Sequence, residues 1–276
     1  MGRYGAHDVY VTPLVRDFPI CFPMLVLCFG VYYAVGQIYP RLLGDAFRRL
    51  PRGKRDDVVV RTVSIYNGVL MIGSAVCFLM NLHANNYHLD DDVYREIPYY
   101  RFFRVSIVAY FVWDVIICFA HKWSMAWKIH ALTSLLGSYM LSFPFSDQYG
   151  SYYTGMFELS NIPLHASSII RILNIPSFIT AATACEFVFA FLFVIIRVIG
   201  GTYVTLSWLR LMLTKLMGSW RSGSDSVHDE FAVVFSMALI FVLQVLQYVW
   251  FGEIVKQIKE RFFPQRSSKL NNKRVE

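Results

Sequence analysis

Charged residues are scarce in this sequence. Asp, Glu, Lys and Arg make up only 16% of its 276 residues, whereas hydrophobic residues make up 56%. Soluble domains usually contain about a quarter charged residues, so this composition excludes an ordinary soluble globular protein. Seven membrane spans of about 20 residues would use about 140 positions. Such an arrangement leaves room only for short loops and two tails.

Cysteine is also scarce, and none is expected in a loop. The cysteines all fall within apolar stretches; they are Cys21, Cys28, Cys77, Cys118 and Cys185. A disulfide framework is therefore not expected. The chain likewise lacks a phosphate-binding Walker loop, a zinc-type Cys/His spacing and a Ser-His-Asp pattern. We therefore expect no metal site, no bound cofactor, and neither ATP hydrolysis nor serine-type hydrolysis.

Seven apolar runs are long enough to cross a bilayer. They cover about residues 18–39, 62–82, 103–120, 127–143, 151–173, 178–199 and 231–251. Pro163 is expected to break the fifth run. Residues 202–220, where Arg210 and Lys215 interrupt the apolar pattern, are predicted to lie on the membrane surface, with a weak extra span as the alternative. The predicted fold class is thus an all-α membrane protein with about seven transmembrane helices.

Basic residues are distributed unequally between the two sides of these spans. Seventeen Lys and Arg residues fall on the side of the 40–61 loop and the tail after Gly252, and seven fall on the opposite side. Because loops rich in Lys and Arg stay cytoplasmic, this distribution predicts a cytosolic C-terminus. It also places the N-terminus and the acidic loop at residues 90–92 outside the cytosol, which requires an odd number of spans.

Five basic residues cluster in the loop after the first span. The cluster consists of Arg48, Arg49, Arg52, Lys54 and Arg55. One hypothesis is that it attracts anionic lipid headgroups, and the alternative is that it acts purely as a topology signal. The sequence contains no recognisable nucleic-acid module, so the net charge of +7 does not indicate a nucleic-acid partner.

Ionisable residues occur inside several predicted spans, where they are costly and usually face a cavity or a partner. Asp114 lies in the third span, His130 in the fourth and Glu158 in the fifth, and we interpret them as catalytic or headgroup-binding candidates. Other polar residues share a helix face with them or lie on other spans. These cavity-lining candidates are Tyr110, His121, Ser134, Asn161, His165, Glu186, Gln244 and Gln247. The pattern predicts a helix bundle around a polar or amphipathic interior.

The alternative for the uncharged polar residues is that they hydrogen-bond one another and hold the helices together. We favour this structural role for Asn67, Ser74, Gln244 and Gln247, and the functional role for the three ionisable candidates. Arg197 lies near the predicted end of the sixth span. There its side chain is expected to reach the membrane interface.

Several short motifs on successive spans resemble the TLC-domain family of membrane proteins, which includes the ceramide synthases and smaller lipid-regulating proteins. The motifs are residues 63–64 (VS), 110–114 (YFVWD), 127–130 (WKIH), 157–160 (FELS) followed by Pro163, 193–198 (FVIIRV) and 243–250 (LQVLQYVW). The resemblance implies a six-helix barrel of two inverted three-helix halves, preceded by one N-terminal helix. It also implies three regions: 1–54 with the first span and the basic loop, a TLC domain at 55–262, and a basic tail at 263–276.

The chain departs from the pattern of the family's catalytic members, which resemble acyltransferases with a His pair in the fourth span and two aspartates in the fifth. Here the His pair is reduced to Ile129 followed by His130, and the aspartate positions are Glu158 and Asn161. The non-synthase branches resemble this pattern better. Those branches are associated with membrane lipid composition and, in one case, with export of cargo from the endoplasmic reticulum.

Three functions follow from the residues and the resemblance. The first is a protein of the endoplasmic reticulum membrane that binds or regulates acyl lipids, with the lipid headgroup near His130 and Glu158. The second is an acyltransferase with His130 as general base and acyl-CoA as co-substrate. The third is a cargo receptor, for which the basic ending of the chain resembles a degenerate retrieval signal. Membrane lipids are the expected partners, and the sequence leaves the lipid and the oligomeric state open.

Overall fold

The computed structural model describes residues 5–143, 145–222 and 227–262. Within these ranges the chain forms helices and connecting turns, without a β-strand. The predicted all-α class is therefore confirmed. The helical elements are α1 (Ala6–Tyr10), α2 (Thr12–Leu42), α3 (Asp45–Arg48), α4 (Arg52–Ala84), α5 (Tyr100–Ala120), α6 (Met125–Met140), α7 (Asp147–Ser151), the π-helix η1 (Tyr152–Met156), α8 (Phe157–Leu173), the 3-10 turn η2 (Pro176–Phe178), α9 (Ile179–Leu192), the π-helix η3 (Phe193–Gly200), α10 (Gly201–Ser222) and α11 (Glu230–Phe262).

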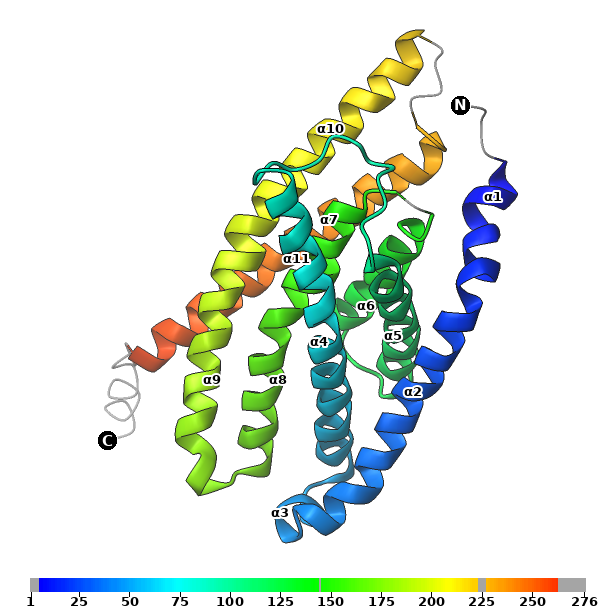
Figure 1. Ribbon diagram of the computed structural model, residues 1–276. Helices are drawn as coiled ribbons and strands as arrows, with labels where there is room; N and C mark the ends of the chain where they lie inside the picture. Colours follow the sequence, from blue (N-terminus) through cyan, green and yellow to red (C-terminus); the bar gives the residue numbers. More distant parts are fainter. Residues whose placement is uncertain (1–4, 144, 223–226, 263–276) are drawn as a thin grey trace, which may run out of the picture.

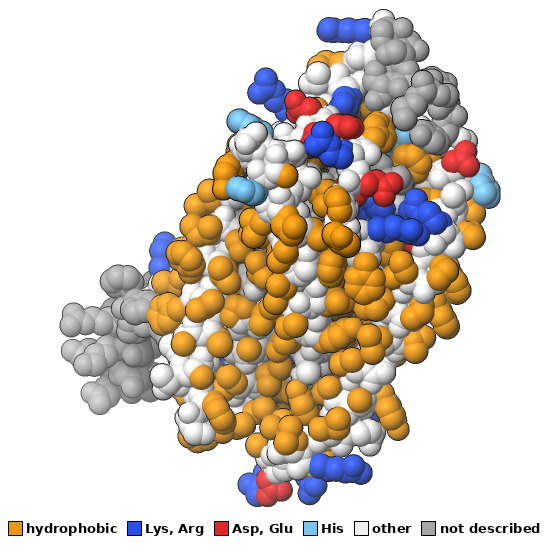
Figure 2. Space-filling view, viewed as in Figure 1, with side chains coloured by type: hydrophobic (Ala, Val, Ile, Leu, Met, Phe, Trp, Pro, Cys, Tyr) orange, Lys and Arg blue, Asp and Glu red, His pale blue; other side chains and the backbone are white. Residues whose placement is uncertain are grey.

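Length and composition make this a membrane protein. Five helical segments of the described chain are long and apolar enough to cross a membrane; they are Ala6–Leu42, Arg52–Ala84, Tyr100–Ala120, Pro176–Arg221 and Glu230–Glu260. The helices α6 and α8 have 16 and 17 residues, fewer than the roughly 20 that a span usually needs. Figure 2 shows apolar side chains over the middle of the visible face and charged side chains gathered at its two ends. This distribution matches a protein whose middle faces hydrocarbon.

Six helical segments pack into a closed ring (Figure 1). The helix α4 packs on α5, α5 on α6, α6 on α11, and α11 on η3 and α10, while α8 contacts both η3 and α4 and so closes the ring. The helix α2 packs outside the ring against α4 and α5. The ring is thus built from two successive runs of three helical segments, preceded by one N-terminal helix, as the resemblance predicted.

The prediction that residues 202–220 lie on the membrane surface is wrong. Elements η2 to α10 form one continuous segment, Pro176–Arg221, of 46 residues, about 69 Å long at 1.5 Å per residue. The yellow and yellow-green ribbon of Figure 1 runs through α9 and α10 without a break. The helix continues through Gly200 and Gly201, where neighbouring side chains pack closely against its backbone. A Cβ on Gly201 would lie 3.0 Å from the ring of Phe157, and a Cβ on Gly200 would collide with Tyr152.

The expected break at Pro163 is also absent. The helix α8 continues through this proline to Leu173, and α7 and η1 precede it directly. Both α4 and α9 pack along α8. Neighbouring helices of this kind allow a proline within a membrane helix, because they support the backbone where its hydrogen bonding is interrupted.

Candidate functional site

The ring of helices encloses a cavity of about 890 Å³, which we refer to as the vestibule. It reaches the end of the bundle near α3, where Pro51, Gly53 and Lys54 are exposed and form part of its rim. Residues of α4, α5, α6, α8, α9, η3 and α11 line it. Its volume falls within the range of about 300–1,000 Å³ that is usual for sites of small ligands.

A narrow pocket of about 70 Å³ adjoins the vestibule inside the bundle. Its wall is mainly apolar, with Ile107, Leu141 and Ile240, and it is lined on the α6 side by the small residues Ser134 and Gly137. A Cβ built on Gly137 would meet no atom within 4 Å. The pocket therefore has room next to α6 for an apolar group.

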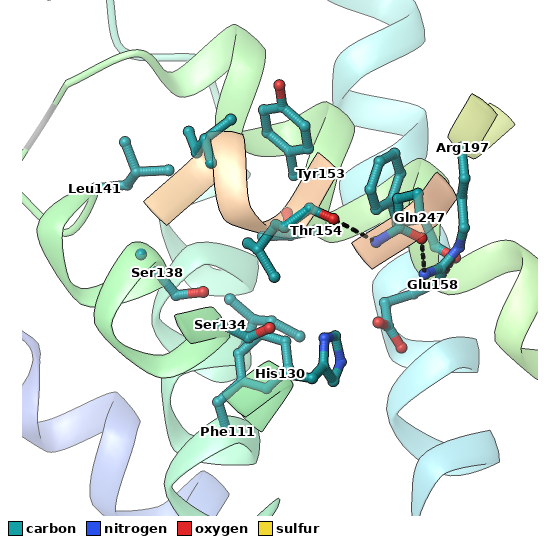
Figure 3. Close-up of a pocket in the computed structure, with 15 residues that line it drawn as sticks. Phe111, His130, Ser134, Ser138, Leu141, Tyr153, Thr154, Glu158, Arg197 and Gln247 are labelled. Carbon is teal, nitrogen blue, oxygen red and sulfur yellow. Dashed lines mark hydrogen bonds between the residues drawn. The ribbon is translucent and has the colours of Figure 1, made fainter. Parts of the chain in front are cut away.

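Four residues line both the vestibule and the narrow pocket, and we refer to them as the neck. They are Phe111, His130, Glu158 and Arg197. Figure 3 shows His130 on one side of this passage and Glu158 and Arg197 on the other. The neck is thus a polar constriction between a large space and a narrow apolar one.

Arg197 is the most highly connected side chain of the neck. It is only 5% exposed, and its Nε donates a hydrogen bond to Ser160 Oγ at 2.8 Å. Its Nη1 donates to Gln247 Oε1 at 3.1 Å, and its Nη2 donates to Asn161 Oδ1 at 2.8 Å and to the carbonyl of Phe157 at 2.7 Å. The guanidinium also lies 4.9 Å from the centroid of the Phe157 ring. These contacts fix the guanidinium of η3 against α8 and α11.

Glu158 is held by two amide side chains from different helices. Asn67 Nδ2 of α4 donates to Glu158 Oε2 at 3.1 Å, and Asn161 Nδ2 donates to Glu158 Oε1 at 3.0 Å. Asn161 accepts from Arg197 at the same time. The buried carboxyl and the buried guanidinium are therefore joined through one amide, and the network connects α4, α8, η3 and α11.

His130 differs from these two groups, because one of its ring nitrogens is free. Its Nδ1 is buried and has no hydrogen-bond partner within the described ranges. Aromatic rings surround the imidazole: Trp250 at 5.1 Å, Trp127 at 6.1 Å and Phe111 at 6.4 Å between centroids. A buried polar atom of this kind usually has a partner, so the geometry suits a ligand in the cavity.

Asp114 also lines the vestibule, and its carboxyl makes little contact with other polar groups. Its side chain is 9% exposed, and the one hydrogen-bond partner recorded for its carboxyl in the described structure is the thiol of Cys118, with Sγ 3.9 Å from Oδ1. One turn earlier, Tyr110 donates to Ser64 Oγ at 3.1 Å. This bond shows which parts of α4 and α5 lie side by side. Because the two helices run antiparallel, Asp114, one turn after Tyr110, lies at the same height in the ring as Val60 and Arg61, about one turn before Ser64.

Five of the other predicted cavity residues do line a cavity. Tyr110, Asn161 and His165 line the vestibule, and Ser134 and Gln247 line the narrow pocket. In a separate contact, His165 Nδ1 lies 3.4 Å from Arg61 Nη1.

The amides and hydroxyls expected to hold the helices together make bonds between helices. Gln244 Nε2 donates to the carbonyl of Arg197 at 3.2 Å and to Thr202 Oγ1 at 3.3 Å. Ser74 Oγ lies 2.8 Å from Thr154 Oγ1, which joins α4 to η1. Gln244 thus hydrogen-bonds the backbone at Arg197 and is not among the residues that line the vestibule or the narrow pocket.

His121 and Glu186 lie outside the cavity, contrary to expectation. His121 ends α5, where its Nε2 is 3.4 Å from Tyr32 Oη and its Nδ1 is 3.8 Å from Asp56. Glu186 faces the outside of α9 and accepts from Arg171 Nε at 2.8 Å. Helical spacing alone could not show this, because both side chains turn away from the cavity towards partners on neighbouring helices.

The basic cluster lies at the vestibule end of the bundle. Arg49 pairs with Asp45 at 2.8 Å, and Arg48 Nε donates to the carbonyl of Pro40 at 2.9 Å. Lys54 lies on the vestibule rim. The cluster is therefore next to the opening of the cavity.

Sequence reasoning missed Arg197 as a site residue. The expectation that its side chain reaches the interface is wrong, because the helix does not end near residue 199 and Arg197 lies inside the ring. The sequence contained one signal for a buried arginine, namely the possible acceptors Ser160, Asn161 and Gln247 on other spans, since a buried arginine needs several acceptors.

Two π-helical segments also border the neck: η3 contains Arg197 and η1 directly precedes Phe157 and Glu158. Such segments occur frequently at functional sites.

Comparison with known families gives a match to the TLC domain over residues 57–256, from the first turns of α4 to near the end of α11. A comparison with curated proteins finds no match. The matched range includes the whole neck and most of the ring.

Proposed function

The chain belongs to the TLC-domain family, a family of membrane proteins connected with lipids, and from this premise we propose that it binds an acyl lipid and regulates membrane lipid composition. An acyl chain would extend through the neck into the narrow pocket. The polar part of the lipid would remain in the vestibule.

One observation carries this proposal: the vestibule and the narrow pocket meet at a polar neck. An amphiphile needs a space with polar groups for its headgroup and an apolar space for its chain. The vestibule supplies the first with Asp114, Lys54 and Arg61, and the pocket supplies the second with Ile107 and Ile240. Ring helices that contribute the polar groups also shield them from hydrocarbon, which lowers the cost of placing them inside a membrane.

Lipid extraction and mass spectrometry of the purified protein test the proposal. Gly137→Leu fills the narrow pocket without a clash at Cβ, and we expect it to reduce the bound lipid several-fold. Gly36→Leu is the matched control, because Gly36 also has no atom within 4 Å of its Cβ and lies on α2 outside the ring. Equal lipid content in the two variants would contradict the proposal.

Acyl transfer is the second candidate function, and the free Nδ1 of His130 favours it. A neutral imidazole in the cavity could take a proton from an attacking amine or hydroxyl, as general-base catalysis requires. The test is incubation of the purified protein with a panel of acyl-CoAs and amine or hydroxyl acceptors. A transfer product that depends on His130 would favour the enzyme over the lipid-binding function.

We also propose that the protein resides in the endoplasmic reticulum membrane, with the vestibule opening on the cytosolic side. The unequal distribution of Lys and Arg supports this orientation. Accessibility labelling of cysteines introduced at Asn86 and Ser268 tests it. Labelling of both from the same side would exclude the orientation, and fluorescence microscopy of the tagged chain tests the compartment.

A further inference from the structure

The vestibule contains four carboxylates, and three of them have an evident explanation. Asp57 pairs with Arg61 at 3.0 Å, and Glu158 accepts from two amides. Glu253 lies exposed at the rim. Asp114 is the exception, because it is nine-tenths buried and its thiol partner lies beyond the length of an ordinary hydrogen bond. The cavity therefore presents one unpaired buried carboxylate to a ligand.

Aromatic side chains also line the vestibule. Three of the six tryptophans of the chain, Trp123, Trp127 and Trp250, belong to its wall. The rings of Trp127 and Trp250 stack with centroids 5.6 Å apart, and Trp123 lies 6.2 Å from Trp127. The backbone N–H of Trp123 donates to the carbonyl of Cys118, the residue that contacts Asp114. The indole wall and the Asp114 carboxylate thus belong to the lining of one cavity.

We propose that the vestibule selects a phosphocholine headgroup, with the quaternary ammonium at Asp114 and the tryptophan wall. This inference rests on the proposed lipid-binding function. Trp, Tyr and Phe attract quaternary ammonium groups through their ring faces, and a carboxylate adds the opposite charge.

A primary ammonium fits this part of the cavity less well. It has three N–H donors and needs several acceptors close together, yet Glu158 and Asp57 are already bonded. A quaternary ammonium has no donor, so one carboxylate and apolar ring faces are sufficient.

Displacement of a fluorescent fatty-acyl probe from the full-length protein in detergent micelles tests this inference. The competitors are phosphatidylcholine, phosphatidylethanolamine and phosphatidic acid with identical acyl chains. We expect phosphatidylcholine to compete about five-fold or more better than the other two, from the usual strength of cation–π contacts with a desolvated charge. Better competition by phosphatidylethanolamine, or equal competition by all three, would overturn the inference while leaving lipid binding in place.

Variants locate the selectivity. Asp114→Asn and Trp250→Leu should each bring the ratio of competition by phosphatidylcholine to competition by phosphatidic acid close to one. Asp8→Asn removes an exposed carboxylate outside the cavity, and Trp220→Leu removes an exposed indole outside it, so both should keep the wild-type ratio. If either control lost the preference to the same extent, the assignment to Asp114 and Trp250 would be wrong. Failure of the probe to bind the wild-type protein would instead refute lipid binding itself.

Discussion

The two ends of the helix ring place buried polar groups in different surroundings. At the end opposite to α3, Arg104 and Asp147 are 1% and 3% exposed and form an ion pair. Asp147 also accepts the backbone N–H of Ile97 at 3.1 Å, and Trp208 Nε1 donates to Ser146 Oγ at 2.9 Å. At the vestibule end, Asp114 and His130 face a cavity instead. The comparison indicates that packed side chains close one end of the bundle, whereas a cavity opens at the other.

Aromatic packing strengthens the same contrast. At the closed end the rings of Phe143, Phe145 and Tyr94 surround His228 at centroid distances of 4.6 to 5.8 Å. At the vestibule end the tryptophans line an open space. Similar residue types thus fill one end of the ring and form the wall of a cavity at the other.

The largest expected effect concerns the ion pair of the closed end. Asp147→Ala leaves Arg104 buried without its carboxylate, which should lower the free energy of unfolding by about 3–5 kcal/mol. Denaturant titration in detergent measures this change. As a control, Asp45→Ala breaks the exposed pair with Arg49 and should cost less than about 1 kcal/mol. Equal losses of unfolding free energy in the two variants would contradict the expectation that the buried pair stabilises the fold more than the exposed pair does.

A smaller loss is expected at the neck. Asn161→Ala removes the amide that joins Arg197 to Glu158, so each charged group loses one partner, and stability should fall by about 1–3 kcal/mol. Ser168→Ala on the same helix removes a hydroxyl that, in the described part of the chain, donates to the carbonyl of Leu164 within α8, and it should have little effect. Thermal unfolding of both variants checks the difference, and an unchanged melting temperature for Asn161→Ala would contradict the network.

The closed end should also respond to acid. Burial lowers the pKa of His228 to about 4, below the usual value of about 6.5. Because the folded state favours the neutral ring, His228 contributes stability above about pH 6.5, and this contribution falls as the pH drops towards 4. At pH 5 the loss should be about 2 kcal/mol. Unfolding curves between pH 7 and 5 test it, and His228→Gln should have a flatter profile.

The smallest expected effect is at His130. If the protein only holds a lipid, His130→Ala should weaken lipid binding several-fold, equivalent to about 1 kcal/mol for one lost hydrogen bond. If His130 is a general base, turnover should instead fall by about 10²- to 10⁴-fold with chain binding nearly intact. His121→Ala is the control, since that imidazole lies outside the vestibule. Lipid content and acyl-transfer rate, measured on the same preparations, separate the two outcomes.

Sequence patterns located part of the site and misplaced the rest. Apolar length identified the spans, and the cost of charge in a membrane indicated Asp114, His130 and Glu158, which all line the vestibule. The same argument failed for Glu186, because Arg171 pairs with it on the outside of the bundle. Arg197 was missed because its position was measured from a predicted helix end that does not exist.

The sequence alone determined the all-α membrane class, the concentration of basic residues in two segments and the family, because each depends on composition, apolar length or local motifs. Only the tertiary structure decided which polar residues meet and which remain free. Asn161 joins Arg197 to Glu158 while Asp114 is left with a thiol, although all four residues are similarly polar and lie within helices. The reason is physical: hydrogen bonds between helices depend on the rotation and level of each helix in the ring, and residues far apart in the chain set these together.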